Sequence, residues 1–167
     1  MDFLTRLKEG PVLVADGAMG TMLQDAGLPP GRPGEAWLLE QPAAIANVHR
    51  AYIEAGSDLI LSCTFGGTRP RLAHADLADR VAQVNRRGVE VAREAAAGRA
   101  YVAGDIGPLG ELLAPLGQRT YAEAVDLFAE QAAALAEAGA DVLYIETMTS
   151  MEEVRAAVEG VRRVAPD

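Results

Sequence analysis

The chain has 167 residues, half of them hydrophobic and 23% charged, which is typical of one globular domain and too short for two ordinary ones. Fifteen Lys and Arg against 24 Asp and Glu give a formal net charge of −9, which argues against nucleic acid or an anionic membrane surface as a partner. One cysteine cannot form an internal disulfide, and with two histidines it cannot complete a structural zinc site.

The N-terminal segment, residues 1–9, is amphipathic and contains acids, so it lacks the apolar stretch of a signal peptide. No apolar run elsewhere approaches the ~20 residues that a membrane-spanning helix needs. We therefore expect a soluble, reduced protein located in the cytoplasm.

Four apolar runs predict buried strands, at residues 11–15, 58–63, 100–103 and 141–145. None of them alternates apolar with polar residues, as a strand with one solvent-facing side would. Continuous apolar runs are typical of parallel strands that are covered on both faces.

Helical patterns separate and follow these runs, at residues 42–55, 71–97, 120–138 and from Ser150 onward. The second helix is expected to be interrupted near Asp76. The third and fourth begin with a hydroxyl residue followed three positions later by glutamate, which is the capping-box pattern. Strand alternating with helix predicts an α/β fold with a parallel sheet built from right-handed crossovers.

A short repeat supports this fold class. The sequences EAGSD at 54–58 and EAGAD at 137–141 each predict a helix that ends on glycine shortly before a strand. A unit of roughly 40 residues fits a (β/α)₈ TIM barrel, and four such units fill this chain. Because four strands cannot close a barrel, we expect one domain over residues 1–167 that forms the N-terminal half of a barrel, apparently truncated.

Polar residues stand where each predicted strand ends. They are Asp16, Cys63 with Thr64, Asp105 and Glu146. Reactive groups of parallel α/β folds gather at the carboxyl ends of the strands, where every strand-to-helix loop opens. Glu146 directly continues an apolar strand, so a cationic partner such as a substrate ammonium would relieve the cost of burying it. A helix-capping or inter-strand hydrogen-bonding role for Glu146 stays open.

The loops between these elements allow more than one interpretation. Residues 16–21 contain two glycines, so they form either a tight turn or a loop whose backbone amides approach an anionic ligand. Cys63 is interpreted as a buried apolar residue rather than a nucleophile, because neither histidine is placed to activate it. The apolar loop at 105–117 fits a lid or a subunit contact.

Four collinear segments resemble the homocysteine S-methyltransferase family, which includes betaine–homocysteine methyltransferase and the homocysteine-binding module of methionine synthase. They are VADGAMGT at 14–21, the stretch from EAG at 54–56 to TFGGT at 64–68, AGDIGP at 103–108 and ADVLYIET at 140–147. The resemblance implies a (β/α)₈ barrel enzyme in which zinc, held by three cysteines, binds homocysteine as its thiolate. The thiolate then attacks a methyl group of betaine, S-methylmethionine or methylfolate, and methionine forms.

The resemblance also implies roles for particular residues. Asp16 and Gly17 would lie at the homocysteine pocket, with nearby backbone amides meeting the substrate carboxylate, and Glu146 would pair with its ammonium group. Cys63 and Thr64 would line the same cavity. The zinc cysteines of the family correspond to positions beyond residue 167, and Cys63 is not one of them. We therefore expect no metal ligand and no catalytic residue in this chain, which would be inactive alone.

Two explanations of the half-length stay open. The chain is either a fragment of a longer protein, or a stand-alone half-barrel that forms a homo-oligomer or pairs with a separate C-terminal half. The alternative function is a non-catalytic half-barrel that serves as a binding or interaction module.

Overall fold

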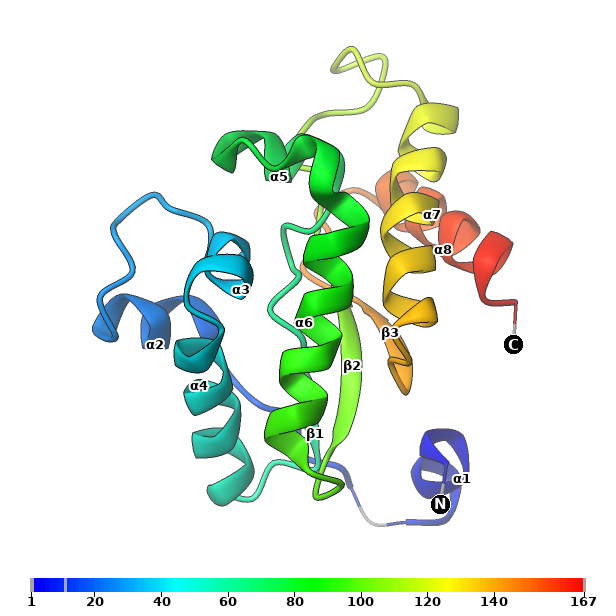
Figure 1. Ribbon diagram of the computed structural model, residues 1–167. Helices are drawn as coiled ribbons and strands as arrows, with labels where there is room; N and C mark the ends of the chain where they lie inside the picture. Colours follow the sequence, from blue (N-terminus) through cyan, green and yellow to red (C-terminus); the bar gives the residue numbers. More distant parts are fainter. Residues whose placement is uncertain (1, 11, 167) are drawn as a thin grey trace.

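The computed structural model describes residues 2–10 and 12–166, which form an α/β protein around a parallel sheet (Figure 1). The sheet has three strands in the order β1 (Leu59–Leu61), β2 (Tyr101–Ile106) and β3 (Val142–Ile145). In the register, Leu61 is opposite Ala103 and Gly104 is opposite Leu143. Three of the four predicted strands are therefore confirmed, in a sheet of the predicted parallel type.

The first predicted strand is reduced to a single bridge, in which Ala15 pairs in parallel with Leu59. Pro11 lies outside the described residues. Val12 and Val14 are 89% and 54% exposed, so burial contributes little to holding this segment in a longer ladder. The segment still runs beside β1, because Asp16 N–H donates to Leu59 O (2.9 Å). The structure thus does not bear out four complete strand–helix units.

Long helices occur close to the positions that the periodicity predicts. They are α4 (Pro42–Glu54), α6 (Val81–Ala96), α7 (Tyr121–Glu137) and α8 (Met151–Val164). The expected interruption is confirmed: α5 (Arg69–Leu72) and two 3-10 turns precede α6, and Asp76 has the left-handed φ of 58°. A left-handed residue cannot continue a right-handed helix.

Four shorter helical elements were not predicted. They are α1 (Phe3–Glu9), α2 (Met19–Asp25), a 3-10 turn (Gly34–Ala36) and α3 (Trp37–Glu40). Each has seven residues or fewer, too few for a periodic pattern to be recognised. The ring of Phe3 meets the ring of Tyr101 edge to face, with 5.5 Å between centroids, which places α1 near the amino end of β2.

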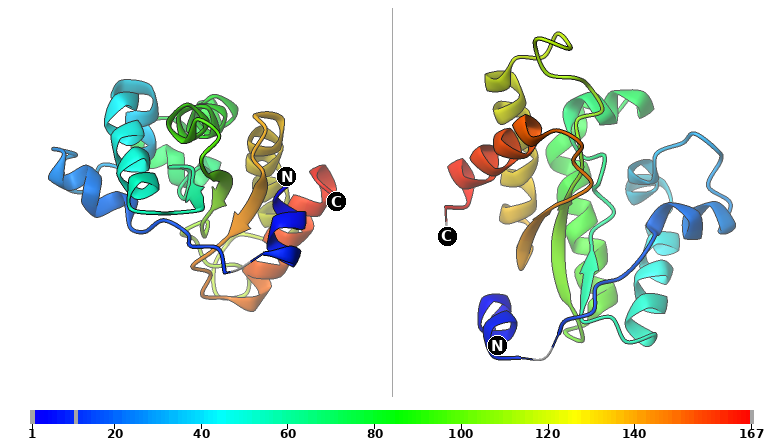
Figure 2. Two further views of the ribbon diagram at one scale, coloured as in Figure 1. Left: turned by 90° about the horizontal axis from the view of Figure 1, so that it is seen from below. Right: turned by 180° about the vertical axis from the view of Figure 1, so that it is seen from behind.

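The helices form a layer over the sheet. Helices α4, α6 and α7 lie side by side along one face, and α8 packs beside α7 (Figure 2). One apolar cluster joins α2, α3 and α4 to α6, and a second joins β1 and β2 to α6, α7 and α8. Phe128 and Leu135 of α7 are fully buried in the second cluster. Within the described ranges, no helix is long and apolar enough to cross a membrane.

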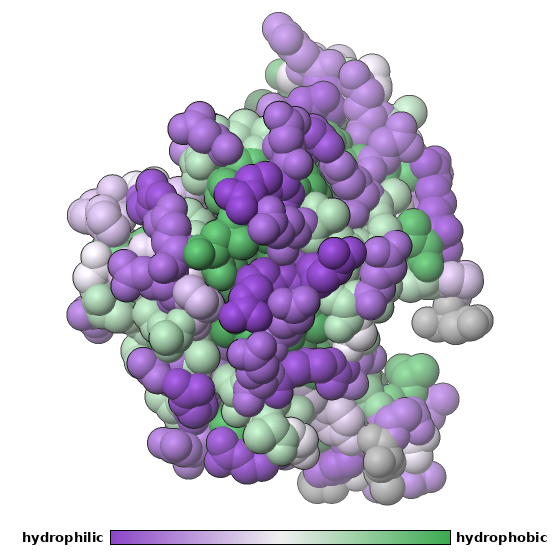
Figure 3. All heavy atoms as spheres, in the orientation of Figure 1, coloured by the Kyte–Doolittle hydropathy of each residue, from purple (hydrophilic) through white to green (hydrophobic). Residues whose placement is uncertain are grey.

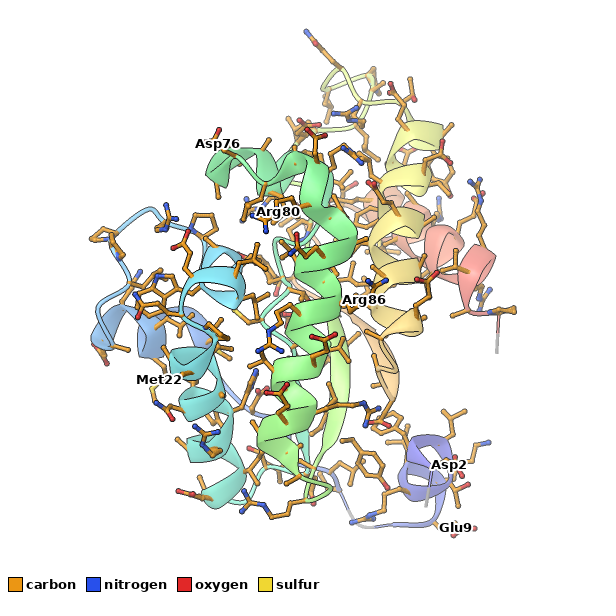
Figure 4. All side chains as sticks on the ribbon, in the orientation of Figure 1. Asp2, Glu9, Met22, Asp76, Arg80 and Arg86 are labelled. Carbon is orange, nitrogen blue, oxygen red and sulfur yellow. The ribbon has the colours of Figure 1, made fainter. Side chains whose placement is uncertain are left out.

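Hydrophilic side chains dominate the outer surface of α6 and α7 (Figure 3). Arg86 on α6 lies 3.7 Å from Glu137 on α7, measured from Nη2 to Oε2 (Figure 4). Arg93, further along α6, lies 2.9 Å from Asp141 at the start of β3. These charges are solvated at the surface, so the helix layer is held mainly by the apolar clusters beneath it.

Both copies of the glycine repeat adopt the same helix end. Gly56 and Gly139 have left-handed φ values of 106° and 85°, which favour glycine because it has no Cβ. Ser57 N–H donates to the carbonyl of Tyr52, and Ala140 N–H donates to the carbonyl of Leu135. These are the 6→1 bonds of a Schellman motif.

The aspartate that closes each repeat joins two neighbouring extended segments. Asp58 N–H donates to Val14 O (2.8 Å), and the Asp58 carboxylate accepts a bond from Val14 N–H (3.0 Å). Asp141 makes the same pair of bonds to Val102, both 2.8 Å long. A side chain thus extends the backbone ladder by one bond at the amino end of the sheet.

The two predicted capping boxes differ. Thr120 and Glu123 exchange both bonds of the box at the start of α7. At α8 the Ser150 hydroxyl accepts from Glu153 N–H, but the buried Glu153 carboxylate accepts from Leu109 N–H (2.9 Å) in the loop after β2. That acid therefore ties the loop to α8 instead of completing the cap.

Candidate functional site

A cavity of about 510 Å³ opens at the carboxyl ends of the strands. Its walls are residues 16–20 with Leu23, the turn at 33–35, residues 61–63 and 65 after β1, and the side chains of Arg71, Asp105 and Glu146. The volume lies within the range of small-molecule sites. Four carboxyl groups and one guanidinium line it, so most of its charged groups are acidic.

Asp16 stands at the end of the bridged segment and is partly buried. Its Oδ2 accepts a hydrogen bond from Leu61 N–H (3.1 Å), which fixes the carboxylate against β1. Burial raises the pKa of Asp16 to about 6, and the nearby charge of Glu146 adds to the increase, whereas the bond from Leu61 opposes it. Asp16 and Glu146 are therefore close enough to interact across one cavity.

Asp105 near the end of β2 is only 5% exposed and is held by its backbone. Its N–H donates to Ser62 Oγ (3.1 Å), and its carbonyl accepts from Thr64 Oγ1 (2.8 Å) and Gln131 Nε2 (3.2 Å). Its carboxylate oxygen Oδ1, by contrast, has no hydrogen-bond partner among the described residues. A rigid backbone thus presents an unsatisfied carboxylate at the cavity wall.

The acids of the cavity repel one another. Burial is the largest cause that raises the pKa of Asp105 to about 8, and the charges of Glu146, Glu35 and Asp16 follow in that order. A like charge nearby disfavours the ionised form of a carboxyl group. A cation bound here would reverse both effects, because it would pair with the carboxylates and restore their ionisation.

Glu35 reaches the cavity from the turn before α3. Its Oε1 accepts a bond from Gly66 N–H (2.5 Å), so it fixes the loop after β1. Burial raises the pKa of Glu35, although its hydrogen bonds and the charge of Arg71 lower it. The pKa of the Cys63 thiol is also raised, first by burial and then by the charges of Glu35 and Asp105.

The zinc site implied by the resemblance is not supplied by these residues. Zinc binds to thiolate, neutral imidazole or carboxylate ligands, and the surroundings of Cys63 favour its protonated thiol. Across residues 2–10 and 12–166, no group of three or more His, Cys, Asp or Glu side chains is arranged to hold a metal ion. Cys63 thus lines the cavity wall, where burial favours its protonated thiol.

Four of the five predicted site residues line the cavity: Asp16, Gly17, Cys63 and Glu146. At Gly17 a Cβ would lie 3.0 Å from the Tyr52 hydroxyl oxygen, so glycine lets that ring approach the loop. Thr64, the fifth, does not line it. The fully buried Thr64 hydroxyl lies 2.7 Å from Ser62 Oγ and donates to Asp105 O, so it supports the wall from behind.

Three charged residues of the cavity lining, Asp105, Glu35 and Arg71, were absent from the predicted site. Asp105 was recognised as a strand-end acid, but only Asp16 and Glu146 among these acids were included in the predicted site. Glu35 and Arg71 carry no such signal, because each lies in a short helical element away from any strand end. Only the folding of these elements over the end of β1 brings them to the cavity.

A parallel α/β sheet with a small cavity at the carboxyl ends of its strands is typical of barrel-type proteins that bind small molecules at this face. The family model for homocysteine S-methyltransferase matches residues 13–166. The chain belongs to this family, as its sequence motifs predicted.

Individual relatives agree with this assignment. Methionine synthases from Mycobacterium leprae and Mycobacterium tuberculosis are each 37% identical over 164 residues, covering 91% of this chain and 14% of their own length. The crystal structure of the homocysteine methyltransferase MmuM from Escherichia coli, oxidized form, matches with a TM-score of 0.83 and 26% identity over 96% of this chain and 61% of MmuM. Its metallated form gives the same TM-score and identity. The chain thus spans about one seventh of those methionine synthases.

Proposed function

We propose that this chain forms the homocysteine-binding side of a homocysteine S-methyltransferase. The observation that carries the proposal is the convergence of Asp16, Asp105 and Glu146 on one cavity. Homocysteine brings an ammonium group, which is the group that three carboxylates lining one cavity would bind. Family membership supplies the identity of the amino acid.

The reaction proposed for the complete enzyme is transfer of a methyl group to the sulfur of homocysteine. The thiolate sulfur forms a bond to the methyl carbon, and the bond from that carbon to the donor breaks with its electron pair leaving on the donor. Betaine, S-methylmethionine and methylfolate remain the candidate donors. The residues of this chain would bind and orient the amino acid.

The metal chemistry of the reaction would have to come from outside the described residues, since they contain no arranged metal-binding group. Zinc keeps a bound thiol ionised at neutral pH. We therefore propose that the 167-residue chain binds homocysteine but does not methylate it alone.

Titration calorimetry with L-homocysteine tests this proposal, in the presence of a reductant and a chelator. We expect binding by the unsubstituted chain and a roughly 10- to 100-fold weaker affinity in the Glu146→Gln variant, which loses a charged partner of the ammonium. Glu152→Gln is the matched control, because Glu152 lies on α8 outside the cavity lining. Unchanged affinity in Glu146→Gln would overturn the assignment.

A non-catalytic binding or interaction module is the second candidate function. It is favoured by the exposure of Val12, Val14 and Tyr144, which leaves apolar surface at the two sides of the sheet. Such a module would self-associate or receive a C-terminal half. Light scattering of the purified chain checks this, and a monodisperse monomer would count against it.

A further inference from the structure

The cavity contains one cationic group among its described lining residues, the guanidinium of Arg71 on α5. No hydrogen bond or ion pair joins this guanidinium to any other described residue, in contrast to Arg69 on the same helix. Arg69 lies 2.5 Å from Glu130 and 3.2 Å from Asp79. Arg71 therefore lines the cavity with no hydrogen bond or ion pair to its guanidinium donors within the described residues.

Two glycines shape the position of the Arg71 side chain. A Cβ on Gly110 would lie 3.0 Å from Arg71 Cδ and 3.0 Å from Nη1, so the backbone of the loop after β2 packs directly against the side chain. A Cβ on Gly66 would lie 3.6 Å from Arg71 Cβ and 2.9 Å from Glu35 Oε1. The Arg71 side chain is thus packed between two loops, at its Cβ and at its guanidinium end, which limits the entropy it would lose on binding a ligand.

Glu35, the cavity acid whose pKa the charge of Arg71 lowers, does not use these donors. Glu35 feels the charge of Arg71, which lowers its pKa against the larger effect of burial, but its carboxylate is bonded to Gly66 N–H and makes no ion pair with the guanidinium. Asp16, Asp105 and Glu146 belong to the strand ends. The cavity therefore has separate sites for a cation and for an anion.

We propose that Arg71 binds a carboxylate group of the ligand in this cavity. The guanidinium is planar and matches a carboxylate with two parallel N–H bonds, which fixes both the position and the angle of the ligand. With the ammonium on the strand-end acids and the carboxylate on Arg71, the charge pattern of the cavity recognises a zwitterion. This inference rests on the proposed function, since it takes homocysteine or a carboxylate-bearing methyl donor as the ligand.

Two ligand pairs distinguish the source of the carboxylate. Homocysteine is compared with 3-aminopropane-1-thiol, which keeps the amine and thiol but lacks the carboxylate. Betaine is compared with choline, which keeps the quaternary ammonium but replaces the carboxylate by a hydroxymethyl group. Calorimetry measures each ligand with the unsubstituted chain, Arg71→Gln, Arg71→Lys and the control Arg69→Gln, which loses surface ion pairs on the same helix.

We expect Arg71→Gln to weaken binding of the carboxylate-bearing member of one pair roughly 10- to 100-fold, while the member without the carboxylate changes less than about twofold. Weaker homocysteine binding would assign Arg71 to the carboxylate of the amino acid, and weaker betaine binding would assign it to the carboxylate of the methyl donor. Arg71→Lys should recover part of the affinity, because it keeps the charge but not the planar fork. Arg69→Gln should leave the affinity for all four ligands unchanged.

The outcome that overturns this inference differs from the one that overturns the proposed function. If homocysteine binds and Arg71→Gln changes all ligands equally or none, Arg71 has no carboxylate to bind and the function stands. If the unsubstituted chain binds neither homocysteine nor betaine, the proposed function fails first. Circular dichroism of each variant verifies that the fold is retained.

Discussion

The two ends of the sheet use the same residue type in opposite ways. At the amino end, Asp58 and Asp141 each accept a backbone N–H from the neighbouring segment. At the carboxyl end, Asp105 is buried with Oδ1 unpartnered. A carboxylate whose bonds are satisfied stabilises the fold, whereas an unsatisfied one costs stability and is available to a ligand. The comparison separates acids that hold the sheet from acids that would bind substrate.

Asp105→Asn should have the largest effect. Its pKa is about 8 in the folded chain against an ordinary value of 3.8, so the folded state binds an extra proton between about pH 4 and 8. Folding stability should therefore fall as the pH rises through this window, and the amide should remove that dependence. We expect a gain on the order of 3 kcal/mol near pH 7, measured by urea unfolding at several pH values. An unchanged pH profile would contradict the assignment.

Asp141→Ala tests the opposite end of the sheet. This substitution removes the bond from Val102 N–H and the ion pair with Arg93, and leaves a backbone donor without its partner. We expect a loss of about 2 kcal/mol in the free energy of unfolding and little effect on homocysteine binding. Asp126→Ala is the control, since Asp126 is an exposed surface acid. A loss of binding without a loss of stability would erase the distinction between the two ends.

His49→Leu tests a second buried titratable group, whose effect on the pH dependence of stability is opposite to that of Asp105. His49 in α4 is fully buried, neither ring nitrogen has a hydrogen-bond partner among the described residues, and burial lowers its pKa to about 4. This group makes stability fall as the pH drops from about 6.5 to 4, opposite in sign to Asp105. We expect the leucine variant to gain about 1 kcal/mol at pH 5 and to unfold less readily in acid. Equal acid sensitivity in both proteins would be the contrary result.

Asp58→Asn should have the smallest effect. The amide oxygen can still accept the bond from Val14 N–H, and only the charge is lost. A change of about 0.5 kcal/mol is expected, against a larger one for Asp58→Ala, both by urea unfolding. Equal losses in the two variants would show that charge rather than hydrogen bonding matters here.

The sequence predicted those parts of the fold that depend on local pattern. Apolar runs placed β1, β2 and β3, and the glycines at 56 and 139 marked helix ends that depend only on backbone conformation. The bridged segment was predicted as a full strand, because its apolar composition does not reveal that Val12 and Val14 are exposed. Strand pairing depends on neighbours that are distant in the sequence.

The residues of the candidate site likewise fall into those visible from a local sequence pattern and those that are not. Asp16, Gly17, Cys63 and Glu146 were found because a strand end is visible in the sequence. Glu35 and Arg71 reach the cavity only through helical elements of three and four residues, whose positions are set by packing. Thr64 was placed at the end of the predicted strand 58–63, whereas β1 ends at Leu61 and the hydroxyl of Thr64 lies behind the wall, donating to Asp105 O.

The bond from Leu109 N–H to the Glu153 carboxylate has a consequence for motion. This bond connects α8 to a loop whose neighbouring Gly110 packs on Arg71, so moving that loop breaks the bond without requiring β2 to separate from its neighbours. The rate of hydrogen exchange at the Leu109 amide therefore reports on movement of this loop separately from global unfolding. A ligand that holds this loop in place would slow exchange at the Leu109 amide and leave the exchange of the β2 amides unchanged.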